Sequence, residues 1–310
     1  MADLPKLYID RPLPEGFEDL FDGRAEVVGP EEEALDSADG VIAGASSWHA
    51  DRIRGLGPSV KVISRSGIGY DTVDLDAATA HGVVICNAPD APTVSTAEHA
   101  VALMFAAAKG LTLSQSNLRS GGGDYFVTNT ALELEGRVLG LIAYGRIARR
   151  VGAVGRALGM EVLASDPYLD QADVELVDLE TLLSRADVVS VHAPLTDQTR
   201  HLFDASAFAQ VKPGIVFVNT ARGGLVDQEA LLAALDSGAV AFAALDVTEP
   251  EPLPTDHPLL AHPRCMVTPH IASATDRGKR RLYDHAISNA LEAVAGQRLV
   301  TCVNPEVYGE

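Results

Sequence analysis

The chain has 310 residues, of which 47% are hydrophobic, so it can bury a large core and is long enough for about two domains. Its formal net charge of −19 argues against nucleic acid or an anionic membrane as a partner, because both attract basic surfaces. The longest apolar run, Ala100–Ala108, is far shorter than the ~20 residues that span a membrane, and Cys86, Cys265 and Cys302 lack disulfide or metal-ligand spacing. A cytoplasmic protein with free thiols is predicted.

The first part of the chain predicts short buried strands followed by a long helix. The strands are near-continuous apolar runs, which is typical of strands that are buried on both faces of a parallel sheet. A longer apolar stretch, residues 93–109, predicts a helix. The expected strands are Lys6–Asp10, Ala25–Val28, Gly40–Ile42, Val60–Ser64 and Val83–Cys86.

A second series follows the glycine-rich segment Ser120–Asp124, which we interpret as a linker or as a mobile arm near the active site or a subunit contact. Strands alternate here with helical patterns such as Asp178–Arg185 and Asp227–Ser237, as they do in βαβ units. The expected strands are Val138–Ala143, Glu161–Ser165, Val188–His192, Ile215–Asn219, Ala241–Asp246 and Met266–Thr268.

These strands are too numerous for one ordinary sheet and divide naturally into two. The predicted fold is therefore α/β, with two doubly wound, parallel-sheet domains. We expect the first domain to cover residues 1–97 and the second to cover residues 98–284. The C-terminal helix, Arg281–Gly296, would return the chain to the first domain, which then also includes residues 285–310.

The stretch Leu139–Arg150, "LGLIAYGRIARR", has the layout of a dinucleotide-binding turn, in which a buried strand leads into a helix. Such a turn asks for glycine three times, and here those places hold Ala143, Gly145 and Ala148. The middle glycine, which lets the backbone approach the pyrophosphate, is kept. Because a methyl group crowds a left-handed backbone, we expect a negative φ at Ala143. The backbone N–H groups of Arg146 and Ile147 would then face the pyrophosphate at the helix N-terminus.

Asp166 supports this interpretation because it ends the next strand, in "VLASDP". A carboxylate at that place accepts hydrogen bonds from the adenosine ribose hydroxyls and repels a 2′-phosphate. NAD rather than NADP is therefore the predicted cofactor. The alternative is that Asp166 only caps the turn before Pro167.

Three more strand ends carry polar residues, and open α/β sheets place their ligands at that edge. Arg222 follows a strand in "VNTARGGLVD", and Asp246 and Glu251 lie in "ALDVTEPEPLP". His270 follows the last strand in "MVTPHIASAT". Singly, each has an ordinary explanation: a surface cation, a solvated loop acid, a structural histidine. Together they form a cation, an acid and a proton donor suited to reducing a carbonyl group.

At these motifs the chain resembles the D-isomer-specific 2-hydroxyacid dehydrogenase family. The resemblance covers nearly the whole length, from "SGIGYDTVDLDAATAHGVVICNAP" through "STAEHAVALM" to "VTPHIASAT", and the run "NTARGGLVDQEAL" is highly specific. It implies a flavodoxin-like substrate domain, split in sequence, and a Rossmann coenzyme domain with the active site between them. It also implies a homodimer formed through the coenzyme domain.

The resemblance implies the catalytic residues position by position. Arg222 matches the arginine that binds the substrate carboxylate and polarises the reacting oxygen, a role suited to a permanently charged fork. His270 matches the acid/base residue, and Glu251 matches the acid that orients its imidazole. Glu251 is preferred over Glu249 because the family's glutamate lies five residues after the aspartate that Asp246 matches.

The same resemblance implies the remaining ligand contacts. Asp246 matches the residue that holds the nicotinamide carboxamide, while Thr96 and Ala221 match positions beside the cofactor. Ile68 and Gly69, in "SGIGYD", match the loop whose backbone N–H groups bind the substrate carboxylate.

The predicted function is NAD-dependent interconversion of a small 2-oxo acid and a D-2-hydroxy acid. Among substrates, "LDVTEPEPLPTDHPLL" most resembles glyoxylate/hydroxypyruvate reductases, and D-3-phosphoglycerate dehydrogenase is the alternative. A phosphorylated substrate would need further basic residues, for which Arg52, Arg54 and Arg65 are candidates. A non-catalytic NAD(H)-sensing protein, like the corepressors that share this fold, is the alternative from another class.

Overall fold

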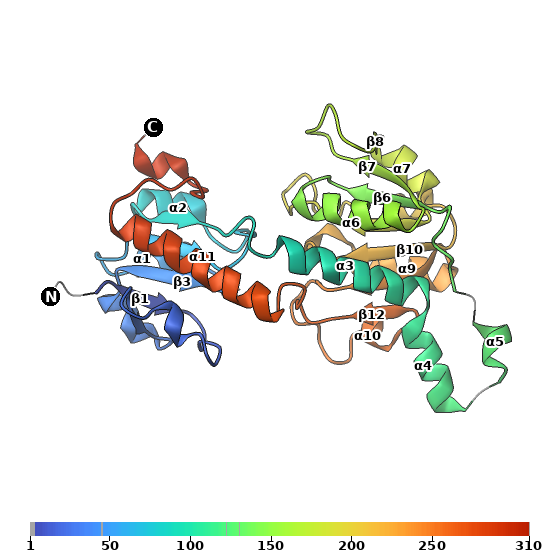
Figure 1. The fold of residues 1–310 in the computed structure, drawn as a ribbon, viewed down its shortest axis with the longest axis horizontal. Helices are drawn as coiled ribbons and strands as arrows, with labels where there is room; N and C mark the ends of the chain where they lie inside the picture. Colours follow the sequence, from blue (N-terminus) through green and yellow to red (C-terminus); the bar gives the residue numbers. More distant parts are fainter. Residues whose placement is uncertain (1–3, 45, 122, 130, 310) are drawn as a thin grey trace. The chain divides into compact units, whose positions relative to one another are not determined.

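Two units make up the chain, each built around its own parallel sheet (Figure 1). The computed structural model describes residues 4–44, 46–121, 123–129 and 131–309. Unit 1 comprises Met1–Pro92 and Ala274–Glu310, and unit 2 comprises Thr93–Ser273. The expected boundaries, 97/98 and 284/285, fall inside the helices α3 and α11, which start at Thr93 and Asp276. An apolar pattern predicts that a helix exists more reliably than where it begins.

Unit 1 contains a five-stranded sheet in the order β2-β1-β3-β4-β5, whose neighbouring strands run parallel in the described part of the chain. This is the flavodoxin-like order. Its elements are β1 (Lys6–Ile9), η1 (Glu18–Leu20), β2 (Glu26–Val28), η2 (Glu32–Ser37), β3 (Gly40–Ala43), α1 (Ala50–Arg54), β4 (Val62–Arg65), α2 (Leu75–Ala80), β5 (Val84–Cys86), α11 (Asp276–Val294) and η4 (Pro305–Tyr308).

Both faces of this sheet are buried, because alternate residues of each strand point to opposite sides. Leu7 and Ile42 pack in one cluster with side chains of α11, including Ile287. Tyr8 and Val41 pack in another cluster with side chains of α1 and α2. The near-continuous apolar runs in the sequence follow from this two-sided burial.

Unit 2 contains a seven-stranded sheet in the order β12-β11-β10-β9-β6-β7-β8, and its neighbouring strands also run parallel over the residues that the structure describes. This is the Rossmann order with one further strand, and the order reverses between β6 and β9. Its elements are α3 (Thr93–Ala108), α4 (Leu111–Ser120), α5 (Tyr125–Thr128), β6 (Val138–Ile142), α6 (Arg146–Ala157), β7 (Glu161–Ser165), β8 (Glu175–Leu176), α7 (Leu179–Arg185), β9 (Val188–Val191), α8 (Ala205–Gln210), β10 (Ile215–Asn219), η3 (Gly223–Leu225), α9 (Gln228–Ser237), β11 (Val240–Leu245), α10 (Pro258–Ala261) and β12 (Cys265–Val267).

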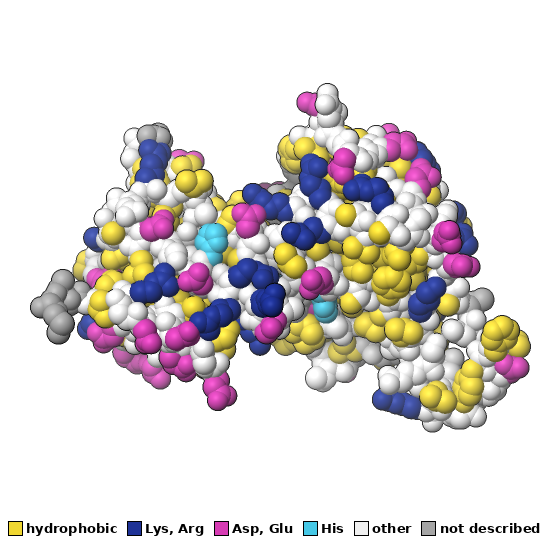
Figure 2. Space-filling model, viewed as in Figure 1, with side chains coloured by type: hydrophobic (Ala, Val, Ile, Leu, Met, Phe, Trp, Pro, Cys, Tyr) yellow, Lys and Arg dark blue, Asp and Glu magenta, His cyan; other side chains and the backbone are white. Residues whose placement is uncertain are grey.

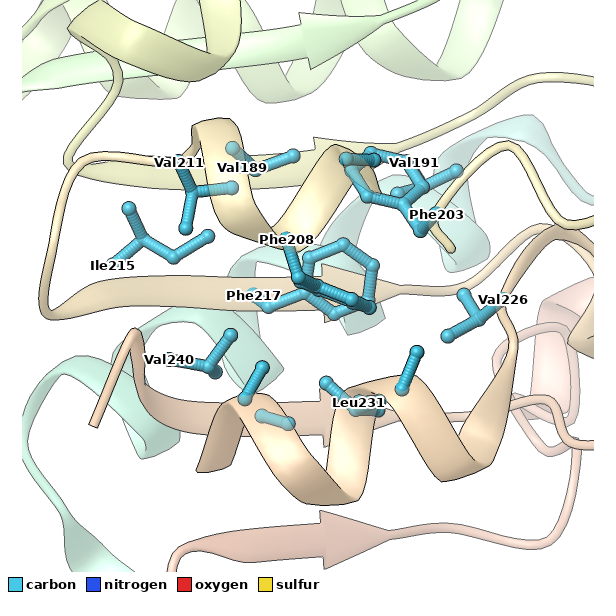
Figure 3. Packing of buried hydrophobic residues seen from close by; sticks show 14 of the residues in the cluster. Val189, Val191, Phe203, Phe208, Val211, Ile215, Phe217, Val226, Leu231 and Val240 are labelled. Carbon is cyan, nitrogen blue, oxygen red and sulfur yellow. The ribbon is translucent and has the colours of Figure 1, made fainter. Parts of the chain in front are cut away.

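Helices cover both faces of the unit 2 sheet. Side chains of α3 and α6 pack on one face, and those of α7, α8 and α9 pack on the other. Figure 3 shows the second cluster, where Phe203, Phe208 and Phe217 gather between the sheet and the helices. Their ring centroids are 4.8 to 5.9 Å apart. This core packs against β10 and β11, and the candidate residues Ala221, Arg222, Asp246 and Glu251 follow the ends of these two strands. The predicted α/β class with two parallel-sheet domains is confirmed.

The glycine-rich segment Ser120–Asp124 lies in unit 2, between α4 and α5 (Figure 1), and its Gly122 is outside the described residues. The three cysteines are free thiols. Burial raises the pKa of Cys86 and of Cys265 to about 12. In the described part of the chain, no helix combines the length and the apolar character needed to cross a membrane.

Candidate active site

The turn after β6 adopts the dinucleotide-binding shape, but not in the way expected at its first position. Ala143 has a φ of 61°, in the left-handed region, so the prediction of a negative φ was wrong. Two hydrogen bonds, which the turn donates to the last residue of β7 and to the residue after it, hold the turn. The Ala143 N–H donates to the Ser165 carbonyl at 2.8 Å, and the Tyr144 N–H donates to Asp166 Oδ2 at 2.9 Å. These contacts impose a conformation that the alanine alone would avoid.

Gly145 provides the open approach that the middle glycine should give. It is the N-cap of α6, and no other atom lies within 4 Å of the place where a Cβ would stand. The N–H groups of Arg146 and Ile147 belong to the first turn of this helix, where N–H groups have no partner within the helix. Ala148 is fully buried, as the third position of the motif requires.

Close packing of α6 on the sheet depends on two further glycines that the sequence analysis did not single out. A Cβ at Gly152 would lie 3.1 Å from Leu141 Cδ1, and one at Gly155 would lie 2.6 Å from Leu139 Cδ2. Helix and strand therefore approach more closely than larger residues allow.

Asp166 lies at the end of β7, beside this turn. Its Oδ2 accepts the Tyr144 N–H and its Oδ1 accepts the Tyr168 N–H at 3.0 Å. The carboxylate thus caps its own turn and also lies next to the turn after β6. The two interpretations considered for Asp166 are compatible with each other.

Arg222 follows β10 in a turn that a buried asparagine organises. Asn219 Nδ2 donates to the Arg222 carbonyl at 2.8 Å, and Asn219 Oδ1 accepts the Ala221 N–H at 3.0 Å. Arg222 Nη1 donates to the Ala221 carbonyl at 2.7 Å. A Cβ at Gly223 would lie 2.0 Å from the carbonyl carbon and oxygen of Thr248. The Arg222 turn is therefore in direct backbone contact with the loop that carries Glu251.

His270 and Glu251 form a pair, with 2.8 Å between His270 Nδ1 and Glu251 Oε2. Both side chains are partly open to solvent, with exposed fractions of 43% and 38%. The other acid of the loop, Glu249, contacts Arg200 instead. Of the two acids, Glu251 is the one that contacts the imidazole.

Asp246 holds the loop on which His270 stands. Its carboxylate is fully buried and accepts the Ile271 and Ala272 N–H groups at 2.9 and 2.8 Å and the Thr268 hydroxyl at 2.6 Å. Its carbonyl accepts the His270 N–H at 2.8 Å. These bonds stabilise a left-handed backbone at His270, whose φ is 53°. Such strain is typical of functional residues that the surrounding structure holds in place.

A histidine on α3 completes this network. His99 Nε2 lies 3.3 Å from Asp246 Oδ1 and 3.2 Å from Thr268 Oγ1. Burial raises the pKa of the Asp246 carboxyl, but the hydrogen bonds outweigh it, that of His99 foremost, and hold this pKa below its ordinary value. Thr96 lies on the same helix and is buried.

A fourth strand end, that of β9, also carries a polar residue that the sequence analysis missed. His192 Nε2 lies 3.0 Å from Ser190 Oγ, at the point where the strand order reverses. Part of the residue reaches the surface, but its Nδ1 is enclosed, and burial lowers the pKa of His192 to about 4. The argument used for Arg222, Asp246 and His270, that a polar residue just after a parallel strand lies at the ligand-binding edge of the sheet, would also have found His192 in "VVSVHAP".

In unit 1, the loop of Ile68 and Gly69 has two carbonyl groups that accept hydrogen bonds from residues at the end of β5. The Gly67 carbonyl accepts the Ala88 N–H at 2.9 Å, and the Ile68 carbonyl accepts Asn87 Nδ2 at 2.7 Å. Because N–H and C=O of a trans peptide point in opposite directions, the Ile68 and Gly69 N–H groups are directed away from these partners. The loop can therefore offer two backbone donors to an anion.

Comparisons with known proteins show which family the chain resembles. The family model described as "D-isomer specific 2-hydroxyacid dehydrogenase, NAD binding domain" matches residues 101–272. A D-3-phosphoglycerate dehydrogenase of Archaeoglobus fulgidus is 43% identical over 222 residues, which are 70% of this chain and 42% of that protein. One of Mycobacterium leprae is 38% identical over 276 residues, which are 87% of this chain and 52% of that protein. The chain spans about half the length of these curated relatives.

Solved structures match over nearly the full chain. A crystal structure of a Thermus thermophilus protein has a TM-score of 0.88 at 34% identity and covers 96% of this chain and 99% of its own. A glyoxylate reductase from Paecilomyes thermophila has a TM-score of 0.86 at 30% identity, with coverages of 98% and 99%. The chain therefore belongs to the D-isomer specific 2-hydroxyacid dehydrogenase family, and unit 2 contains its NAD-binding domain.

Proposed function

We propose that the protein is an NAD-dependent oxidoreductase that interconverts a 2-oxo acid and the D-2-hydroxy acid. One observation carries the proposal: His270 Nδ1 lies 2.8 Å from Glu251 Oε2. The loop of this pair is in backbone contact with the turn of Arg222, through Gly223 and Thr248. A proton donor with its orienting acid, next to a permanent cation, is the set of groups that carbonyl reduction needs.

In this mechanism Arg222 binds the substrate carboxylate and polarises the carbonyl oxygen. Its guanidinium fork matches the planar carboxylate and keeps its charge at any working pH. We further propose that the Ile68 and Gly69 N–H groups bind the same carboxylate, as the resemblance implies. Both contributions counter the repulsion between an anionic substrate and a chain of net charge −19.

His270 exchanges the proton. With Nδ1 donating to Glu251, Nε2 is the ring nitrogen left to give a proton to the ketone oxygen and to take it back in the reverse reaction. The carboxylate also fixes the orientation of the imidazole ring for this exchange.

The cofactor that fits unit 2 is NAD. The open space above Gly145 and the helix N-terminus at Arg146 and Ile147 suit a pyrophosphate, and Asp166 suits a ribose with a free 2′-hydroxyl. When bound, NAD(H) supplies or accepts the hydride. We propose that Ala143 shapes this turn.

Three further contacts with the cofactor are carried over from the resemblance. We propose that Thr96 and Asp246 lie beside the nicotinamide end of the cofactor and that Ala221 also contacts the cofactor. Asp246 also acts by holding the His270 loop, since its carboxylate already accepts hydrogen bonds from the loop itself and from His99.

Two substrate classes remain candidates, and D-3-phosphoglycerate dehydrogenase is supported at least as well as glyoxylate/hydroxypyruvate reductase. Curated relatives carry the first name and a solved structure carries the second. Among the basic residues considered for a phosphate, Arg52 contacts Glu32 and Arg54 contacts Asp51. Arg65 Nε instead donates to the Gly69 carbonyl at 3.1 Å, which brings a cation to the proposed substrate loop.

Steady-state kinetics test the proposal. NADH and NADPH oxidation would be measured with glyoxylate, hydroxypyruvate, 3-phosphohydroxypyruvate and pyruvate. We expect turnover with NADH and a clear preference for it over NADPH, and the best substrate decides between the two classes. Tight NADH binding with no turnover across this panel would favour the NAD(H)-sensing alternative.

A further inference from the structure

An ion pair outside the proposed catalytic set lies over the Arg222 turn. Arg200 Nη1 lies 3.1 and 2.9 Å from the two carboxylate oxygens of Glu249. The backbone of Glu249 is also held, because its N–H donates to Gln228 Oε1 at 3.3 Å and its carbonyl accepts the Gln228 amide. The acid that does not contact His270 is thus fixed from two sides.

The segment that carries Arg200 is bonded to the Arg222 turn as well. The His201 N–H donates to the Gly224 carbonyl at 2.8 Å, and the Phe203 N–H donates to the Leu225 carbonyl at 3.0 Å. A Cβ at Gly224 would lie 3.2 Å from Arg200 Nη1 and 3.3 Å from Glu249 Oε2. The ion pair therefore lies directly beside Gly224, where there is little room for a side chain.

The loop of Glu249 also carries Glu251, the carboxylate that contacts His270. Glu251 Oε1 accepts the Thr248 N–H at 3.1 Å, while its Oε2 contacts His270. Glu249 stands between these two residues in sequence, so its ion pair restrains the segment that carries both the Thr248 contact with Gly223 and the carboxylate of Glu251. One ion pair thereby connects the Arg222 turn with the His270 partner.

We infer that Arg200 and Glu249 are positioning residues that fix the distance between the substrate-binding arginine and the Glu251–His270 pair. This inference rests on the proposed function. A substrate held by Arg222 must present its carbonyl oxygen to His270, and a misplacement of about 1 Å costs on the order of a hundredfold in rate. Both partners are nearly half exposed, at 49% and 45%, and exposed ion pairs add little to stability. Their loss should appear in kinetics rather than in unfolding.

The test uses Arg200→Met, Glu249→Gln and the charge-exchanged double variant Arg200→Glu/Glu249→Arg. For the single variants we expect kcat/KM to fall about tenfold, with a raised KM for the 2-oxo acid. Their NADH dissociation constants and melting temperatures should stay at the wild-type values. The double variant should recover part of the loss, because its two side chains can form the ion pair again with the charges exchanged.

A matched control exists at the edge strand β8 of the unit 2 sheet. Arg185 and Glu175 form an ion pair of similar exposure, with 2.8 Å between Nη1 and Oε1 and exposed fractions of 37% and 52%. Arg185→Met and Glu175→Gln should leave kcat/KM unchanged. Wild-type kinetics in both Arg200→Met and Glu249→Gln would overturn the inference.

A binding measurement separates this inference from the proposed function. Oxamate, an unreactive analogue of a 2-oxo acid, is titrated into the NADH complex of each variant. A weaker oxamate affinity in Arg200→Met but not in Arg185→Met supports the positioning role, whether or not turnover is detected. If the wild type is active and Arg200→Met binds oxamate as tightly as the wild type does, the positioning role alone is refuted. A wild type that neither turns over substrates nor binds oxamate would refute both the positioning role and the proposed function.

Discussion

Ala143 occupies a left-handed backbone position that normally belongs to glycine, with φ at 61°. A methyl group there costs about 1–2 kcal/mol, while glycine would lose more chain entropy on folding, by about 0.5–1 kcal/mol. We therefore expect Ala143→Gly to raise the free energy of unfolding by about 1 kcal/mol. The NADH dissociation constant should change by less than about tenfold, because the turn already has its final shape. Urea unfolding and NADH fluorescence titration measure the two quantities, and a loss of stability would contradict the assigned strain.

His192 gives the fold a dependence on pH. Burial lowers the pKa of this imidazole from 6.5 to about 4, so the unfolded chain binds its proton more readily than the folded one. The contribution of His192 to the free energy of unfolding is fully present above the pKa of the unfolded state and is lost as the pH falls from 6.5 toward about 4. When the pH is lowered from about 7.5 to about 5, the free energy of unfolding should fall in both proteins. The fall should be smaller in His192→Gln than in the wild type, by up to about 2 kcal/mol. Parallel pH dependences of the two proteins in urea unfolding would rule out this role.

At the residue scale, the sequence predicts side-chain chemistry better than backbone shape. Arg222, Asp246 and His270 can be found from the sequence because each is a polar residue that follows a clear apolar strand pattern. Such a pattern does not predict φ angles. The left-handed φ at Ala143 arises from hydrogen bonds to Ser165 and Asp166, which exist only once the two strands have paired.

Gly223 links two loops at the scale of the structural elements. A Cβ at this position would lie 2.0 Å from the Thr248 backbone, which a side-chain rotation cannot relieve. We expect Gly223→Ala to separate the Arg222 turn from the Glu251 loop, with at least about a hundredfold lower turnover and about 1–3 kcal/mol lower stability. Steady-state kinetics and urea unfolding measure these effects.

Gly55→Ala is the control for this variant. Gly55 has a φ of −80°, and the nearest atom to an added Cβ would be the Arg52 carbonyl oxygen at 3.5 Å. It should fold and turn over like the wild type. A fully active Gly223→Ala protein would show that the backbone contact does not matter for the reaction.

The elements themselves were largely predictable because most strands are apolar on both faces. The strand β8, Glu175–Leu176, was missed since two residues carry no periodic signal. The start of α11 was expected at Arg281 but lies at Asp276, because Thr275 caps the helix through its hydroxyl to the Gly278 N–H at 2.9 Å. Its first turn, Asp276–Lys279, is polar and gives no apolar pattern to read.

At the scale of the whole molecule, the segment of unit 2 that contains α4 and α5 exposes apolar side chains and is a candidate contact surface for the expected homodimer. Figure 2 shows hydrophobic side chains gathered on the segment of α4 and α5, where Leu118, Phe126 and Val127 are 65%, 93% and 74% exposed. Exposed apolar residues that cluster in this way mark a contact surface. We propose that a second copy of the chain covers them.

Phe126→Ser combined with Leu118→Ser tests the dimer. Light scattering coupled to gel filtration should give a dimer for the wild type and a monomer for the double variant, because the contact loses its apolar anchors. Val300→Ser, which changes a fully exposed side chain of unit 1, should remain dimeric. A monomeric wild type would exclude the homodimer.

The proton-donor role of His270 is the central claim, and His270→Gln tests it most directly. NADH oxidation with the best 2-oxo acid is compared between this variant and the wild type, with NADH binding measured in parallel. We expect turnover to fall by about 10²–10⁴-fold, the usual contribution of a general acid, while the NADH dissociation constant stays within a few-fold. Retained turnover in His270→Gln would contradict the account, because no proton donor paired with Glu251 would then be needed.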